Sequence, residues 1–83
     1  QSYLNNKDYQ AAISYIESLS YLSPKIKKAY QRITYLKGTE YFNKKKFASA
    51  ITLFEKSLQH TVDVKLSREA NFWIGESYSW VHS

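Results

Sequence analysis

Apolar residues recur along this chain at the spacing of amphipathic helices, and the clearest run lies within residues 46–60. They are placed at i, i+3, i+4, i+7 and i+11, which sets them on one face of a helix: Phe47, Ala50, Ile51, Phe54 and Leu58. A second helix is predicted over residues 24–42, because Ser23 followed by Pro24 is a helix-start signal. The polar residues 43–46 separate the two runs. The pattern therefore predicts an antiparallel helical hairpin.

A glycine inside the first of these helices needs a structural reason. Gly38 costs a helix interior about 1 kcal/mol relative to alanine. We expect Gly38 to lie opposite Ala50, where two small residues allow the helix backbones to approach closely. The rings of Tyr41, Phe47 and Phe54 would then fill the space around this contact.

Further helices are predicted on both sides of the hairpin. One covers residues 8–22 and is capped by Asp8, and the last is capped by Asp63 and runs towards Trp80. Residues 1–6 are interpreted as the end of an earlier helix. The few glycines and the single proline favour long helices over a β-sandwich or barrel.

The hairpin pattern returns at two other registers of the chain. A shift of 38 residues places Ala12 on Ala50, and a shift of 37 places Gly75 on Gly38. Tyr78 then stands three residues after its glycine, as Tyr41 does. Three copies of one pattern indicate a repeat.

The repeated residues resemble the signature of the tetratricopeptide repeat, a helix–turn–helix unit of about 34 residues. The residues that carry the resemblance are Leu36, Gly38, Tyr41, Phe47, Ala50, Ile51, Phe54 and Leu58. Three positions depart from the family pattern: Thr34 replaces an aromatic residue, Ser57 an alanine and Val62 a proline. The residues expected to pack as the repeat signature does are Gly38, Tyr41, Ala50, Phe54, Gly75 and Tyr78.

The resemblance implies an all-α, right-handed superhelix of stacked hairpins, with about four helices and an N-terminal stub. Its single domain would hold a partial repeat over residues 1–22, a complete one over 24–60 and a partial one over 63–83. Because the chain then starts and stops inside repeats, we expect it to be a piece of a longer array.

The same resemblance implies a non-catalytic scaffold or adaptor that binds a partner protein on its concave side, which each hairpin's first helix lines. The groove residues expected there are Arg32, Tyr35, Thr39, Phe42, Glu69, Phe72 and Glu76. Tyr35, Phe42 and Phe72 are the expected anchors, although Phe42 and Phe72 could instead pack between repeats. Repeats that grip an acidic C-terminus use lysine, asparagine and arginine at positions held here by Tyr35, Thr39, Glu69 and Trp73. Such a tail is therefore not the expected ligand.

The net charge of +5 leaves a second class of function open. The alternative is a basic module that binds nucleic acid or another polyanion. Its candidate residues are Lys25, Lys27, Lys28, Arg32 and Lys44 to Lys46, with Tyr21, Tyr30 and Tyr35 as stacking rings. Lysines on the solvated face of a helical array explain the same charges, so protein binding is preferred.

Catalytic and metal-binding patterns are missing from the sequence. His60 and His82 stand apart from each other and from carboxylates at ligand spacing. There is no G-x-S-x-G element, and Gly38 and Gly75 are too far apart to form a phosphate-binding loop. We therefore expect no enzyme activity, cofactor or metal. No apolar run approaches the roughly 18–20 residues of a membrane span.

The last predicted helix carries more apolar residues than its neighbours can cover. These are Phe72, Trp73, Ile74, Tyr78, Trp80 and Val81. Because no later helix follows in the chain, we expect self-association through the face that bears Trp73 and Trp80.

A finer resemblance bears on location. AYQRITYLKGTEYFNKKKFASAITLFEKSL followed by ANFWIGESY is similar to arrays in cell-envelope proteins of Bacteroidota. It implies a bacterial periplasmic or cell-envelope location, and it names no partner.

Overall fold

A computed structural model describes residues 8–82, and this part of the chain is built of helices, with no strand among its residues. The helices are α1 (Tyr9–Glu17), α2 (Pro24–Asn43), α3 (Phe47–Ser57) and α4 (Val64–Val81). The predicted all-α class is confirmed. The expected N-terminal stub, residues 1–6, lies outside the described residues.

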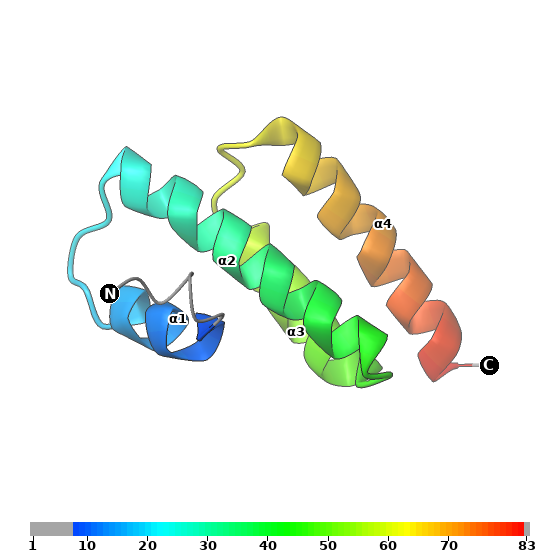
Figure 1. Ribbon diagram of the computed structural model, residues 1–83. Helices are drawn as coiled ribbons and strands as arrows, with labels where there is room; N and C mark the ends of the chain where they lie inside the picture. The colour runs from blue at the N-terminus through cyan, green and yellow to red at the C-terminus, as the bar shows by residue number, and fades with distance from the viewer. Residues whose placement is uncertain (1–7, 83) are drawn as a thin grey trace.

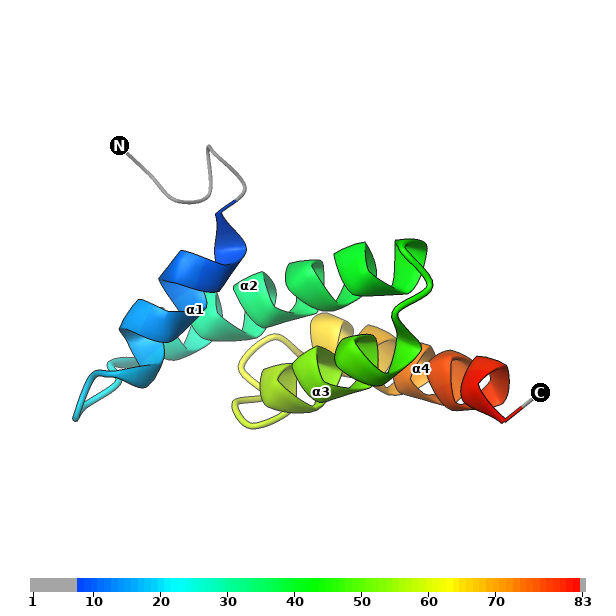
Figure 2. The same cartoon turned by 90° about the horizontal axis from the view of Figure 1, so that it is seen from below.

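The long helix α2 is the centre of the arrangement. In Figure 1, α4 runs beside α2 and α3 lies behind it. Figure 2 shows α3 and α4 together below α2, with α1 packed near the start of α2. Because α3 contacts both α2 and α4, it forms a hairpin with each of them. This is the expected stacking of helical hairpins.

Local signals fix the starts of three helices as predicted. The side chain of Asp8 accepts from the Ala11 amide, Ser23 from the Ile26 amide, and Asp63 from the Leu66 amide, each at 3.2 Å. These bonds satisfy amides that a helix start otherwise leaves unpaired. The caps are Asp8, Ser23 and Asp63.

Two helix ends come earlier than the sequence pattern predicted. The helix expected over residues 8–22 ends at Glu17, and the one expected over 46–60 ends at Ser57. At the first end, the Ser18 hydroxyl donates to the Tyr15 carbonyl at 2.6 Å and competes with a further helical turn. The following leucines remain half-buried without being helical, so their apolar spacing was misleading.

Gly38 lies against the ring of Phe54. A Cβ atom at Gly38 would lie 2.8 Å from two atoms of the Phe54 ring, and the nearest atoms all belong to that ring. Phe54 is fully buried, in a cluster with Ala50 and Ala70. The glycine therefore makes room for the Phe54 ring, as expected of a ring beside this contact, and the pairing of Gly38 with Ala50 stays a prediction.

A buried glutamine joins α2 to the connection before α4. Gln31 is fully buried, and its Nε2 donates to the Asp63 carbonyl and to Ser67 Oγ, both at 2.9 Å. Its Oε1 accepts from the Asp63 amide at 2.7 Å. The side chain thus replaces backbone partners that an irregular connection lacks. Gln31 holds the start of α4 against α2.

A carboxylate ties α1 to the hairpin. Glu17 Oε2 accepts from the Tyr30 hydroxyl at 2.6 Å and from Lys56 Nζ at 2.8 Å. The bond from Lys56, and next the bond from Tyr30, lower the pKa of Glu17 below its ordinary value of 4.5. Because the folded-state pKa is lowered, this contribution to stability is present above pH 4.5 and is lost as the pH falls through the folded-state pKa.

We expect acidification to weaken the parent chain more than the Glu17→Gln variant. The difference should reach about 0.5–1 kcal/mol, a modest value because solvent screens this partly exposed pair. Urea denaturation at pH values from neutral to below the ordinary glutamate pKa measures it. Glu55→Gln, at an exposed position of α3, is the matched control and should respond to acid as the parent does. Equal acid losses in the parent and Glu17→Gln would contradict this role.

Candidate functional site

Five aromatic rings form a continuous series across the side of the molecule where α2, α3 and α4 meet. Phe72 contacts Trp73 with 5.2 Å between ring centroids, and Trp73 contacts Phe42 at 4.9 Å. Phe42 then contacts Phe47 at 5.2 Å, and Phe47 stacks on Trp80 at 5.8 Å. We call these five residues the aromatic series.

The helices position this series by their spacing. Phe42 lies in the last turn of α2, and Phe47 is the first residue of α3. Trp73 and Trp80 are seven residues apart on α4, which places them on one face two turns apart. The two ends of the series, Phe72 and Trp80, are 59% and 58% exposed, whereas the three rings between them are half-buried. The aromatic series is therefore exposed to solvent at both ends and half-buried in the middle.

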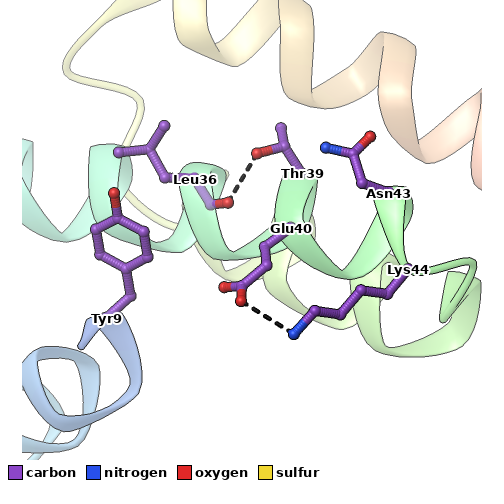
Figure 3. Close-up of a pocket in the computed structure, with 6 residues that line it drawn as sticks. All are labelled: Tyr9, Leu36, Thr39, Glu40, Asn43 and Lys44. Carbon is purple, nitrogen blue, oxygen red and sulfur yellow. Dashed lines mark hydrogen bonds and ion pairs between the residues drawn. The ribbon is translucent and has the colours of Figure 1, made fainter. Parts of the chain in front are cut away.

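Two hollows adjoin on α2 beside this series. The first has a volume of about 370 Å³ and extends from α1 onto α2 (Figure 3). It is lined by Tyr9, Leu36, Thr39, Glu40, Asn43 and Lys44. The second, of about 140 Å³, is lined by Thr39, Phe42, Asn43 and Trp73. Because Thr39 and Asn43 line both, the two hollows adjoin along α2, between α1 and α4, and we call them together the groove.

The polar side chains of the groove differ in the ion pairs and hydrogen bonds that they make within the protein. Glu40 pairs with Lys37 and Lys44, each at 3.2 Å, and these lysines lower the pKa of its carboxyl. It is therefore ionised at neutral pH. Thr39 Oγ1 donates to the Leu36 carbonyl at 2.7 Å within α2. The Asn43 amide makes no side-chain hydrogen bond with the rest of residues 8–82, so it can bond a ligand.

The expected anchors differ from one another in the structure. The Tyr35 hydroxyl donates to Glu69 Oε1 at 2.7 Å, and burial, followed by this carboxylate, raises the pKa of Tyr35. Its ring also lies 5.7 Å from that of Phe54, so Tyr35 helps hold α4 against α2. Phe42 packs between Phe47 and Trp73, as the alternative interpretation held. Of the three expected anchors, Phe72 is the exposed one.

The structure brings together only some of the other residues predicted to line the groove. Thr39 lies in both hollows, and Glu69 is bonded to Tyr35. Arg32 is exposed and Glu76 half-buried, and neither lines a hollow described above. The sequence reasoning missed Leu36 and Asn43 as groove residues. Their i, i+3, i+7 spacing with Thr39 was the available signal.

The two tryptophans on this face of α4 differ in exposure. Trp73 is half-buried between α2 and α4 against Phe42, so the expectation that it is exposed for self-association was wrong. Trp80 stacks on Phe47 and remains 58% exposed. Self-association through α4 stays a prediction, and Trp80 is the exposed one of its two tryptophans.

Gly75, the second glycine of the repeat signature, has open space beside it, unlike Gly38. A Cβ atom at Gly75 would meet nothing within 4 Å, and Tyr78 is 45% exposed. The packing expected of Gly75 and Tyr78 by analogy with Gly38 and Tyr41 does not occur in the described structure. The reason is that, among residues 8–82, no helix covers this face of α4 as α3 covers α2.

The basic residues lack the stacking rings that polyanion binding was expected to use. Tyr30 is buried and bonded to Glu17, and Tyr35 is bonded to Glu69. Of the three candidate rings, only Tyr21 is exposed, at 74%. The arrangement disfavours the stacking part of the polyanion alternative.

The helices and the acidic and histidine side chains of residues 8–82 bear on two other kinds of function. None of the helices there is both long and apolar enough to cross a membrane. The same residues contain no group of three or more histidine, cysteine, aspartate or glutamate side chains that could hold a metal ion.

Comparison with known families agrees with the hairpin arrangement. The family model described as tetratricopeptide repeat matches residues 1–26 and 28–59, which together make up more than half of the chain. The second match covers most of α2 and all of α3. No curated protein and no solved structure matches the chain, so the similarity to Bacteroidota cell-envelope proteins stays a prediction. The repeated helical hairpins and the two matches lead to one conclusion: the chain belongs to the tetratricopeptide repeat family.

Proposed function

We propose that the chain is a non-catalytic scaffold that binds a segment of a partner protein in the groove formed by the two adjoining hollows, with Phe72 at its edge. Repeats of this family generally mediate protein–protein interactions. The observation that carries the proposal is the exposed Phe72 ring beside Trp73, next to a hollow that Phe42 and Trp73 line. Exposed aromatic residues are enriched at protein interfaces.

The chemistry of the groove suits an extended peptide. Leu36, Phe42 and Trp73 supply apolar surface for its side chains. Between them, the Asn43 amide offers both donors and an acceptor, as a peptide backbone requires. An apolar lining with few convergent polar groups is typical of ligand sites. Main-chain bonds would give affinity, and the hollows would give specificity.

The test is selection of binding peptides from a random library on the immobilised chain, followed by affinity measurements with variants. We expect Phe72→Ser to weaken the selected peptides by roughly five- to thirty-fold, the loss usual for an aromatic anchor. Tyr15→Ser is the matched control, because Tyr15 is equally exposed, at 60%, on α1 and lines none of the groove. It should leave the affinity unchanged.

Two results would contradict this function. One is a set of selected peptides whose affinity changes by the same factor in the Phe72→Ser and Tyr15→Ser variants. The other is affinity that Phe72→Ser leaves unchanged but that falls steeply between roughly 50 and 200 mM salt, which is the behaviour of a polyanion site.

A further inference from the structure

We propose that the chain has a second recognition pocket, at the α2–α3 turn, which takes one apolar side chain flanked by acidic residues in the partner segment. The pocket has a volume of about 250 Å³ and is lined by Phe42, Asn43, Lys45, Phe47 and Trp80. We call it the turn pocket. The inference rests on the proposed function, because it names the chemistry of the same partner.

The walls of the turn pocket are aromatic and come from three helices. Phe47 and Trp80 stack with 7° between their planes, and Phe42 meets Phe47 edge-on at 72°. These contacts join the end of α2, the start of α3 and the end of α4. The volume is below that of most small-molecule sites, so one side chain is the occupant that fits. Because Asn43 also lines the groove, a single peptide can reach both places.

Positive charge is concentrated in the turn that forms one side of this pocket, and Lys45 lines the pocket itself. Lys44, Lys45 and Lys46 follow one another and are exposed, and Lys44 is paired with Glu40. Among the described residues, neither Lys45 nor Lys46 has an acidic partner. The uncompensated ammonium group of Lys45 at an apolar hollow, with Lys46 next to it in the chain, favours an acidic segment, and the net charge of +5 acts in the same direction.

The backbone at Lys45 adds an independent argument. Lys45 has φ of 62°, in the left-handed region that a lysine rarely adopts. Its amide donates to the Phe42 carbonyl and the Lys46 amide to the Tyr41 carbonyl, both at 2.9 Å, which is a helix ending that usually employs glycine. Folding alone would therefore favour glycine at position 45. A strained residue that lines a pocket is typical of a functional position.

The test uses a blocked pentapeptide of phenylalanine between two pairs of glutamates, titrated into the chain and followed by the indole N–H resonances. We expect the Trp80 resonance to shift with saturation. Peptides with alanine in place of phenylalanine, or with lysines in place of the glutamates, should bind at least about tenfold more weakly. Equal binding of either control peptide would overturn the proposal.

Variants at position 45 separate recognition from folding. Lys45→Gly should raise the melting temperature by a few degrees, because it relieves the left-handed residue, yet weaken the probe by roughly three- to tenfold. Lys45→Arg should retain binding. Lys25→Ser, which removes one charge from an exposed position at the far end of α2, should bind as the parent does. Parental binding by Lys45→Gly, or equal losses in Lys25→Ser and Lys45→Gly, would overturn the proposal.

Other occupants give distinct results. A Trp80 resonance that shifts with protein concentration alone would show a second copy in the turn pocket and would overturn the proposal. Failure here also differs from failure of the groove. Suppose that Phe72→Ser abolishes binding of the selected peptides, while neither Lys45→Gly in the chain nor acidic residues in the peptides change that binding. The proposed function then stands and the turn pocket does not.

Discussion

Gln31→Leu is expected to lower the free energy of unfolding by about 2–3 kcal/mol, although leucine fills nearly the same volume. The substitution removes the acceptor for the Asp63 amide and two donated bonds, one of them to Ser67. A buried polar group left without a partner costs more than the bond itself contributed. The loss should appear as a lower urea midpoint with an unchanged denaturant slope.

Thr34→Val is the matched control for this prediction. Thr34 is also fully buried on α2, but its hydroxyl donates only to the Tyr30 and Gln31 carbonyls of the same helix. Its removal orphans no backbone group outside that helix, so we expect a change below about 1 kcal/mol. Equal losses in Thr34→Val and Gln31→Leu would show that Gln31 acts only as a filler of space.

The two glycines of the repeated pattern should respond in opposite directions to alanine. Gly38→Ala should lower the free energy of unfolding by about 1–3 kcal/mol, because its Cβ would lie 2.8 Å from the Phe54 ring in a buried cluster. Gly75→Ala should raise it by about 0.5–1 kcal/mol, because the site is open and alanine favours a helix. Thermal or urea denaturation of both variants measures the difference.

Each glycine also checks a separate part of the structure. A Gly38→Ala variant as stable as the parent would contradict the packing of α3 on α2. A loss of stability at Gly75 would show that another helix, such as one from a second copy, covers the open face of α4. The paired comparison needs no assumption about the unfolded state, since the same substitution is made twice.

Local features of this chain were predictable because they depend on neighbouring residues. Ser23 before Pro24, and Asp63 before an apolar run, identified two helix starts that the structure confirms. The repeated hairpin pattern correctly indicated stacked hairpins, although Gly75 does not pack as Gly38 does. The end of α1 was not predictable, because its apolar spacing continues past Glu17 without a glycine or an early proline.

Contacts between helices could not be predicted from the sequence pattern. The role of Gln31 depends on the path of the connection before α4, which no local signal encodes. Phe42 and Trp73 were assigned to different surfaces from their helix positions, yet their rings lie 4.9 Å apart. The crossing of α2, α3 and α4 decides which aromatic residues meet, so the aromatic series could be recognised only in three dimensions.

The most direct measurement of the central claim is amide chemical-shift mapping of the chain with a selected peptide. The proposed function predicts that the largest changes fall on the second half of α2, from Leu36 to Asn43, and on α4 around Phe72 and Trp73. The indole N–H of Trp73 should shift as well, while α1 beyond Tyr9 stays unchanged. Changes centred instead on Lys25 and Lys28, at the first turns of α2, would contradict the groove as the binding surface.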